Sequence, residues 1–251
     1  MRILLSNDDG FDAPGMEVLR RIAAELSDDI YVVAPAKEQS GASRSLTLHD
    51  PLRITKYTDH EYSVEGTPTD CVMMALNYLF PDEKPDLILS GVNRGGNLGE
   101  DVLYSGTVAA ACEGTLLGVR SVALSQCLLD ADQMYWETAA AMAPGIIKKL
   151  LTMEWGEDVF MNINFPAIPK EEVTGVAVTE QGKRDLSNLS IDNRVDARGR
   201  EYFWLGYRPT IGKPAAGTDL QAVINRQVSV TPLKLNLTEQ RLAGELKKVL
   251  A

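Results

Sequence analysis

Two adjacent carboxylates, Asp8 and Asp9, follow a short apolar run near the start of the sequence. The run covers residues 3–5, and Asn7 and Gly10 flank the two acids. An apolar run that stops this abruptly predicts a buried strand of a parallel sheet. The acids would then lie just past the carboxyl end of the strand, where open α/β sheets bind ligands. Two carboxylates beside an amide suit an oxygen-preferring cation such as Mg²⁺ or Mn²⁺, although Asp and Gly also make ordinary solvated turns.

Three more loops are expected at the same edge of the sheet, because each follows a predicted strand or precedes a predicted helix. They cover residues 36–45, 66–70 and 91–107. Loops at the carboxyl ends of parallel strands meet at one edge, so these three should join residues 7–10 there. The oxygen donors that the loops would bring together are Asn7, Asp8, Asp9, Ser40 and Asn93.

The triplet Ser105-Gly106-Thr107 precedes a good helix-forming run at residues 108–111. The first turn of a helix presents free N–H groups and a positive dipole end, which favour a bound phosphate by about 0.3–2 kcal/mol per charge. Gly106 would allow a phosphate to approach the backbone closely. Taken alone, the triplet also fits a plain helix N-cap.

Established phosphate and hydrolase motifs are mostly missing. Gly91 and Gly96 have the glycine spacing of a P-loop, but Asn97 follows where the lysine is required. The sequence has no G-x-G-x-x-G fingerprint, and no cysteine has an arginine six positions further on. With only His49 and His60, a histidine-rich metal site is impossible and a Ser-His-Asp triad is disfavoured. Any hydrolysis would therefore rely on carboxylates and a metal ion.

Length and composition indicate one ordinary globular α/β domain, with 251 residues of which 45% are hydrophobic. The net charge of −10 argues against a broad surface for nucleic acid or anionic membranes. The cysteines Cys71, Cys112 and Cys127 have no metal-ligand spacing and predict reduced core thiols. No apolar run reaches the length of a signal peptide or a membrane span. We expect a soluble cytoplasmic protein without a membrane or an extended nucleic acid as partner.

The apolar patterns predict a three-layer, Rossmann-like α/β fold with a mostly parallel sheet. The single domain, residues 1–251, would have a core at about 1–157 and a β-rich extension at about 158–251. Strands are expected at residues 3–5, 30–34, 52–57, 62–65, 87–89, 121–125, 159–164, 173–178 and 228–230. Helices are expected at residues 14–26, 68–80 and 105–111, at 136–151 with an interruption at 144–145, and from residue 238. Residues 181–200 are polar and show no clear periodicity.

Five motifs occur in order within residues 1–126. They are Asn7-Asp8-Asp9-Gly10, Ala34-Pro35 followed by Glu38-Gln39-Ser40-Gly41, Gly66-Thr67-Pro68-Thr69-Asp70-Cys71, Ser90-Gly91-Val92-Asn93-Arg94-Gly95, and Tyr104-Ser105-Gly106-Thr107-Val108. Together they resemble the signature of the SurE family, the survival-protein nucleotidases. The last third of the chain matches more loosely, mainly through residues 217–219 and 228–232.

The resemblance implies a metal-dependent 5′-nucleotidase, a phosphomonoesterase of nucleoside 5′- and 3′-monophosphates with short polyphosphate as a secondary substrate. It also implies one divalent cation per subunit, Mg²⁺ or Mn²⁺, on Asp8, Asp9, Ser40 and Asn93. These are the donors that the loop argument produced.

We therefore expect Asp8, Asp9 and Asn93 to be catalytic. The residues expected to bind or position substrate are Asn7, Ser40, Gly91, Asn97, Ser105, Gly106 and Thr107. Either Asp9 or Asp101 could take a proton from the attacking water, and the sequence does not decide between them.

The family resemblance further implies a homodimer or homotetramer in which a C-terminal arm, part of about residues 183–232, is exchanged. The alternative is an intramolecular hairpin that covers the core, and the aromatic cluster of Tyr202, Phe203, Trp204 and Tyr207 fits either arrangement. Two other functions stay open: a metal-dependent transferase, and a nucleotide-sensing module with a degenerate site.

Overall fold

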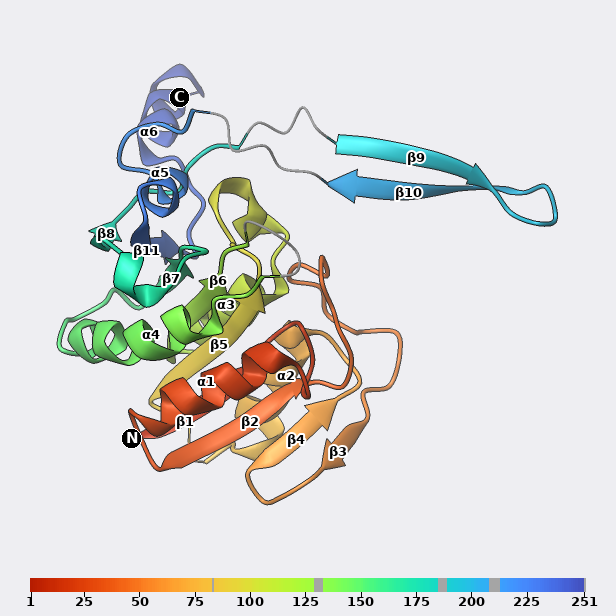
Figure 1. Cartoon of the computed structure of the whole chain (residues 1–251), viewed down its shortest axis with the longest axis horizontal. Helices are drawn as coiled ribbons and strands as arrows, with labels where there is room; N and C mark the ends of the chain where they lie inside the picture. The colour runs from red at the N-terminus through yellow and green to blue at the C-terminus, as the bar shows by residue number, and fades with distance from the viewer. Residues whose placement is uncertain (83, 129–132, 185–188, 208–212, 251) are drawn as a thin grey trace.

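A nine-stranded, mostly parallel sheet lies at the centre of the computed structural model, which describes residues 1–82, 84–128, 133–184, 189–207 and 213–250 (Figure 1). Its strand order is β3-β4-β2-β1-β5-β6-β7-β11-β8, and only the β3–β4 and β7–β11 pairs are antiparallel. The strands are β1 (Arg2–Ser6), β2 (Asp29–Pro35), β3 (Ile54–Lys56), β4 (Glu61–Val64), β5 (Leu87–Arg94), β6 (Arg120–Gln126), β7 (Val159–Phe165), β8 (Gly175–Val178), β9 (Leu189–Val195), β10 (Glu201–Tyr207) and β11 (Gln227–Lys234). β9 and β10 form a separate antiparallel hairpin.

Helices cover both faces of the sheet, which gives the three layers predicted from the sequence. They are α1 (Pro14–Ala24), α2 (Pro68–Met74), α3 (Gly106–Leu116), α4 (Trp136–Leu151), α5 (Asp219–Ile224) and α6 (Gln240–Leu250). One buried apolar cluster unites α1 and α4 with the sheet, and a second unites α2 and α3 with it. The α/β fold class is therefore confirmed.

Local signals explain where the site-bearing helices begin. Pro14 occupies the first turn of α1, where its missing N–H costs nothing. Thr67 caps α2 through a reciprocal capping box with Asp70. Ser105 caps α3, since its side chain accepts a hydrogen bond from the Val108 N–H at 3.0 Å.

Three details of the sequence prediction are wrong. Helix α4 runs through Pro144 without interruption, because its apolar face, including Ala143 and Ile147, packs into the core and outweighs one lost backbone hydrogen bond. The helix expected to reach residue 80 changes after α2 into a π-helical turn, Ala75–Leu79. The polar stretch at 181–200 contains β9, whose backbone pairs with β10 without needing an apolar pattern of its own.

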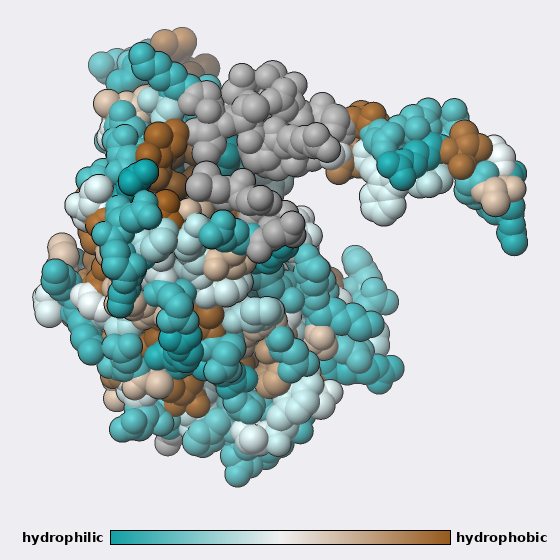
Figure 2. Space-filling model, in the orientation of Figure 1, coloured by the Kyte–Doolittle hydropathy of each residue, from teal (hydrophilic) through white to brown (hydrophobic). Residues whose placement is uncertain are grey.

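The β9–β10 hairpin extends away from the body of the molecule instead of covering the core (Figure 1). It carries hydrophobic side chains in the open, visible in brown in Figure 2, and Trp204 and Leu205 are 61% and 79% exposed. The neighbouring residues 185–188 and 208–212 of the expected exchanged arm lie outside the described residues. In the described ranges, no helix combines the length and the apolar character needed to cross a bilayer.

Candidate functional site

The site is built on two neighbouring central strands, β1 and β5. Ser6 at the end of β1 is paired in parallel register with Ser90 of β5. The motif Asn7-Asp8-Asp9-Gly10 therefore leaves the sheet directly beside the segment that begins at Gly91. Side chains of both segments consequently meet at the carboxyl edge of the sheet, as the parallel topology predicts.

Asp8 is buried against the start of α3. Its Oδ1 accepts a hydrogen bond from the Thr107 hydroxyl. The residue as a whole is only 4% exposed. Burial raises the pKa of Asp8, and hydrogen bonds from Thr107 and from the Gly106 backbone oppose this rise without cancelling it. This contact requires glycine at position 106, because a Cβ there would lie 2.7 Å from the Asp8 Cβ.

Asp9 lies nearer the surface and points toward β5, where its Oδ2 accepts a hydrogen bond from the Arg94 N–H at 3.2 Å. Burial, followed by the charge of Asp8, raises the pKa of Asp9 to about 6, and Glu38 adds to this rise. Two carboxylates are thus held together in a partly desolvated place. Such an arrangement costs free energy unless a proton or a cation compensates the charge.

Ser40 and Asn93 come to the same edge. The Gln39 N–H donates to the Asp8 carbonyl oxygen at 2.8 Å, which places Ser40 one residue from this contact. The Ser40 hydroxyl donates to Glu38 Oε1 at 2.8 Å, so its lone pairs stay available as acceptors. The Asn93 Nδ2 donates to the Gly95 carbonyl oxygen at 2.9 Å, which leaves the amide oxygen as the atom that could ligate.

These four residues fit a small divalent cation by their chemistry. Two carboxylates, a hydroxyl and an amide are all hard oxygen donors, the kind that Mg²⁺ and Mn²⁺ prefer. Among the described residues, no cluster of three or more His, Cys, Asp or Glu side chains is arranged for a metal ion. In the predicted site, the neutral oxygens of Ser40 and Asn93 would complete the ligand set.

Three residues predicted to position substrate make contacts with neighbouring parts of the chain around the site. Asn7 is fully buried, and its Nδ2 donates to the Gly10 carbonyl oxygen at 2.7 Å, which shapes the turn around the two acids. Gly91 has a φ of +137°, and a Cβ there would lie 2.2 Å from the Leu124 carbonyl oxygen. Asn97 is buried in a polar network, with its backbone N–H bonded to Asn164. Contact of these three residues with substrate stays a prediction.

Two residues of the triplet 105–107 use their hydroxyl groups differently: one caps the helix and the other binds the Asp8 carboxylate. The plain N-cap interpretation is correct for Ser105, whose hydroxyl accepts from the Val108 N–H. Thr107 turns its hydroxyl to Asp8. The sequence could not show this contact, since the two residues are 99 positions apart. Phosphate binding by the triplet stays a prediction.

Asp101, the other acid considered as a proton acceptor, is held by a guanidinium. Arg184 Nη2 lies 2.5 Å from Asp101 Oδ2, and both side chains are largely buried. The Leu98 N–H also donates to Asp101 at 3.3 Å. Asp219 reinforces this corner, because it accepts from the Gly99 and Gly182 N–H groups at 2.8 Å each. These contacts of Arg184 and Asp219 were not predicted from the sequence, although residues 217–219, which match the family loosely, were a signal for Asp219.

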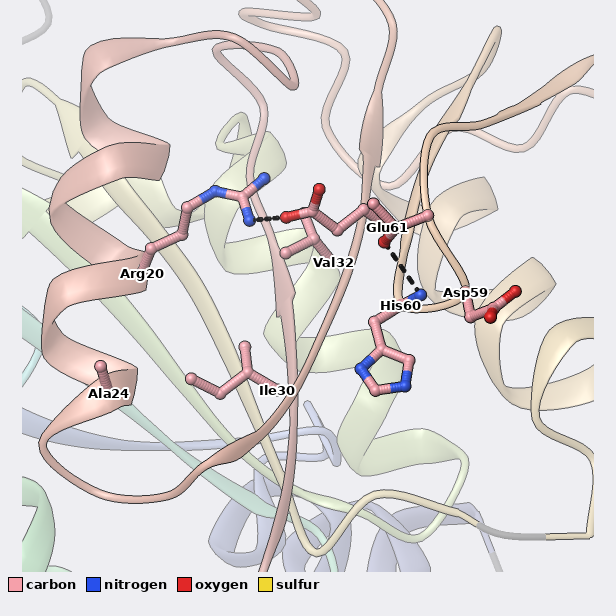
Figure 3. A pocket seen from close by; sticks show the side chains of 8 residues that line it. Arg20, Ala24, Ile30, Val32, Asp59, His60 and Glu61 are labelled. Carbon is pink, nitrogen blue, oxygen red and sulfur yellow. Dashed lines mark hydrogen bonds and ion pairs between the residues drawn. The ribbon is translucent and has the colours of Figure 1, made fainter.

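A cavity of about 620 Å³ lies away from these carboxylates, between α1, β2 and the turn before β4 (Figure 3). Arg20 and Glu61 form an ion pair in its wall. His60 is exposed there and stacks on Tyr31 with ring centroids 4.4 Å apart. Neither Asp8 nor Asp9 lines this cavity.

Comparisons with known proteins agree with the motifs. The sequence model of the family described as survival protein SurE matches residues 3–188. The protein named 5′-nucleotidase SurE from Caulobacter vibrioides is 54% identical over 253 residues, covering 100% of this chain and 96% of the relative. The protein of the same name from Beijerinckia indica is 52% identical, covering 100% and 98%. The crystal structure of the SurE protein from Aquifex aeolicus matches all of both chains with a TM-score of 0.85 at 39% identity. The chain belongs to the SurE family.

Proposed function

We propose that this protein is a metal-dependent 5′-nucleotidase that hydrolyses nucleoside 5′-monophosphates to nucleoside and phosphate. The full-length relatives named as 5′-nucleotidases support this activity. The observation that carries the proposal is the position of Asp8 at the first turn of α3, with Asp9 next to it at the end of β5. Nucleoside 3′-monophosphates are also substrates in this proposal, with short polyphosphate as a secondary substrate.

Asp8, Asp9, Ser40 and Asn93 are the residues that would hold one divalent cation, Mg²⁺ or Mn²⁺. When bound, such a cation supplies positive charge for the phosphate and lowers the pKa of a water molecule. Thr107 fixes the orientation of the Asp8 carboxylate through its hydroxyl. The start of α3 provides an electropositive helix end for the phosphate.

Asp9 is the better candidate for accepting the proton of the attacking water. Its carboxylate lies at the site edge, where Arg94 N–H is its hydrogen-bond donor. Asp101 is instead engaged by Arg184, and a carboxylate in a buried ion pair is a poor proton acceptor. The product of the reaction would be a nucleoside and inorganic phosphate, with no second substrate required.

A phosphate-release screen tests the activity. We expect AMP and GMP to release phosphate with Mg²⁺ or Mn²⁺ and without any acceptor, and we expect a chelator to abolish the release. Nucleoside 3′-monophosphates and tripolyphosphate belong in the same screen. Release that depends on a second substrate would identify a transferase. Metal-dependent nucleotide binding without turnover would identify a sensing module.

We also propose that the protein forms a homodimer or homotetramer through exchange of a C-terminal arm. The exposed hydrophobic side chains of the β9–β10 hairpin support this assembly, because isolated two-stranded hairpins are marginal in water. Helix α6 has no buried residue and presents Leu242, Leu246 and Val249 at helical spacing. Both elements would gain cover in an exchanged assembly.

Substituting two hairpin residues tests the assembly. We expect the double variant Phe203→Ser, Leu205→Ser to raise the dissociation constant of the assembly by about a hundredfold, because two large apolar contacts worth about 1.5 kcal/mol each are lost. Light scattering coupled to size-exclusion chromatography measures the molar mass. Glu201→Gln, an exposed polar position of the same strand, is the control. An unchanged molar mass down to nanomolar concentration would contradict a role for the hairpin.

A further inference from the structure

The segment that carries Ser40 has no helix or strand of its own. It joins β2 to β3 and appears in Figure 1 as the orange loop at the edge of the sheet. Its position must therefore be set by contacts with other parts of the chain. One contact is known from the site, where the Gln39 N–H donates to the Asp8 carbonyl oxygen. On the other side of Ser40, the loop needs a second attachment.

Asp70, at the start of α2, makes that second attachment. Its Oδ1 accepts from the Thr47 N–H at 3.1 Å, and its Oδ2 accepts from the Thr47 hydroxyl at 2.6 Å. Oδ2 also accepts from the Thr67 N–H at 2.9 Å. The Thr67 hydroxyl in turn donates to the Ser45 carbonyl oxygen at 2.8 Å. Two consecutive parts of the loop are thus bound to the first turn of α2.

The arrangement exceeds what a helix cap requires. A capping box needs one carboxylate oxygen for the N–H of Thr67, whereas Asp70 uses both oxygens and directs two further bonds to Thr47. Asp70 is 3% exposed, so these charge-assisted bonds are shielded from water. Gly66 makes room for the carboxylate, since a Cβ there would lie 2.8 Å from Asp70 Oδ2.

The loop is therefore fixed at both ends of the stretch that contains Ser40. Gln39 attaches it to Asp8, and Thr47 attaches it to Asp70. Between them, the Ser43 hydroxyl donates to the Leu103 carbonyl oxygen at 2.7 Å. In the described part of the chain, Asp70 makes no hydrogen bond to a predicted ligand of the cation, and its two bonds to Thr47 connect it to the loop that carries Ser40.

We propose that Asp70 is a positioning residue of the metal site, which holds Ser40 in place by binding Thr47. This inference rests on the proposed function, because it assigns Asp70 a role toward the cation that Asp8, Asp9, Ser40 and Asn93 would hold. The proposal also assigns a role to the Gly66-Thr67-Pro68-Thr69-Asp70 motif, which contains none of the predicted cation ligands.

Two measurements on the full-length protein test the proposal. The first is the rate of tryptic cleavage after Arg44, within the loop, followed by mass spectrometry. The second is the dissociation constant of Mn²⁺ alone, measured by electron paramagnetic resonance. We expect Thr47→Val to raise both by about three- to tenfold, the loss expected for one side-chain hydrogen bond. Thr47→Ser keeps the hydroxyl and should match the wild type in both.

A matched control separates positioning from general destabilisation. Thr138 is buried in α4, and its hydroxyl donates to the Ile168 carbonyl oxygen at 2.6 Å, so this bond involves no residue of the loop. Thr138→Val should lower the melting temperature about as much as Thr47→Val and leave both loop readouts within about twofold of the wild type. Asp70→Asn should exceed Thr47→Val in both readouts.

The outcomes distinguish the inference from the proposed function. Unchanged cleavage after Arg44 in both Thr47→Val and Asp70→Asn would overturn the attachment itself. Faster cleavage with an unchanged dissociation constant for Mn²⁺ would overturn the positioning role alone. A wild-type protein that binds no Mn²⁺ would overturn the proposed function together with the positioning role.

Discussion

Asp9→Asn is expected to stay folded and to lose about a hundredfold to a thousandfold in the rate of phosphate release, equivalent to about 3–4 kcal/mol of transition-state stabilisation. The substitution keeps the size of the side chain and its acceptor for the Arg94 N–H. It removes one negative charge from the predicted cation site and the candidate proton acceptor. Steady-state release of phosphate from AMP at saturating Mn²⁺ measures the loss.

The same variant should be at least as stable as the wild type when a chelator is present. Burial and Asp8 raise the pKa of Asp9 to about 6, so near neutral pH its charge costs more in the folded than in the unfolded chain. Folding stability from this group is therefore present at lower pH and lost as the pH rises through about 6. Removing the charge should raise the melting temperature of the metal-free protein, and Mn²⁺ should stabilise the wild type more than the variant.

Asp12→Asn is the matched control for this experiment. Asp12 lies three positions further along the same loop and is exposed. We expect its substitution to leave the rate and the response to Mn²⁺ within about twofold of the wild type, as for most surface positions. Near-wild-type hydrolysis by Asp9→Asn would contradict the assignment of Asp9 to the site.

The site-bearing half of the fold could be predicted because its signals are local. The apolar run before Asp8, the proline of α1 and the cap at Thr67 each fix one boundary by chemistry within a few residues. Parallel topology then determines which loops share an edge. The local signals and the parallel topology together predict that the four loops meet. The identity of the cation ligands is still to be tested by the experiments above.

Contacts between distant residues could not be predicted in the same way. From the sequence, Thr107 could equally be a surface residue of the first helical turn. The packing of α3 against β5 and β6 brings its hydroxyl to Asp8. Arg184 neutralises Asp101 from a segment without apolar periodicity. Pro144 predicted a break in α4, because helix propensity includes the hydrogen bond that proline removes. It does not include the stabilisation from burying the apolar face of the helix.

Gly106→Ala should lose about tenfold to a hundredfold in kcat/KM and about 1–3 kcal/mol in stability, the range expected for overpacking. The new Cβ would lie 2.7 Å from the Asp8 Cβ, 3.0 Å from Asp8 Oδ2 and 3.0 Å from Pro68 Cγ. Asp8 or α3 would then have to move, and the predicted ligand would leave its place. The kinetics of phosphate release and chemical denaturation measure the two effects.

Helix propensity alone makes the opposite prediction, since alanine is the better helix former. Gly145→Ala provides that comparison within the same protein, because Gly145 lies inside α4 and a Cβ there would meet nothing within 4 Å. Its stability should rise by about 0.5–1 kcal/mol with unchanged activity. If Gly106→Ala behaved like Gly145→Ala, the close approach of α3 to Asp8 would be unimportant. Opposite signs at the two glycines would show that the contact with Asp8, and not the helix, requires glycine at position 106.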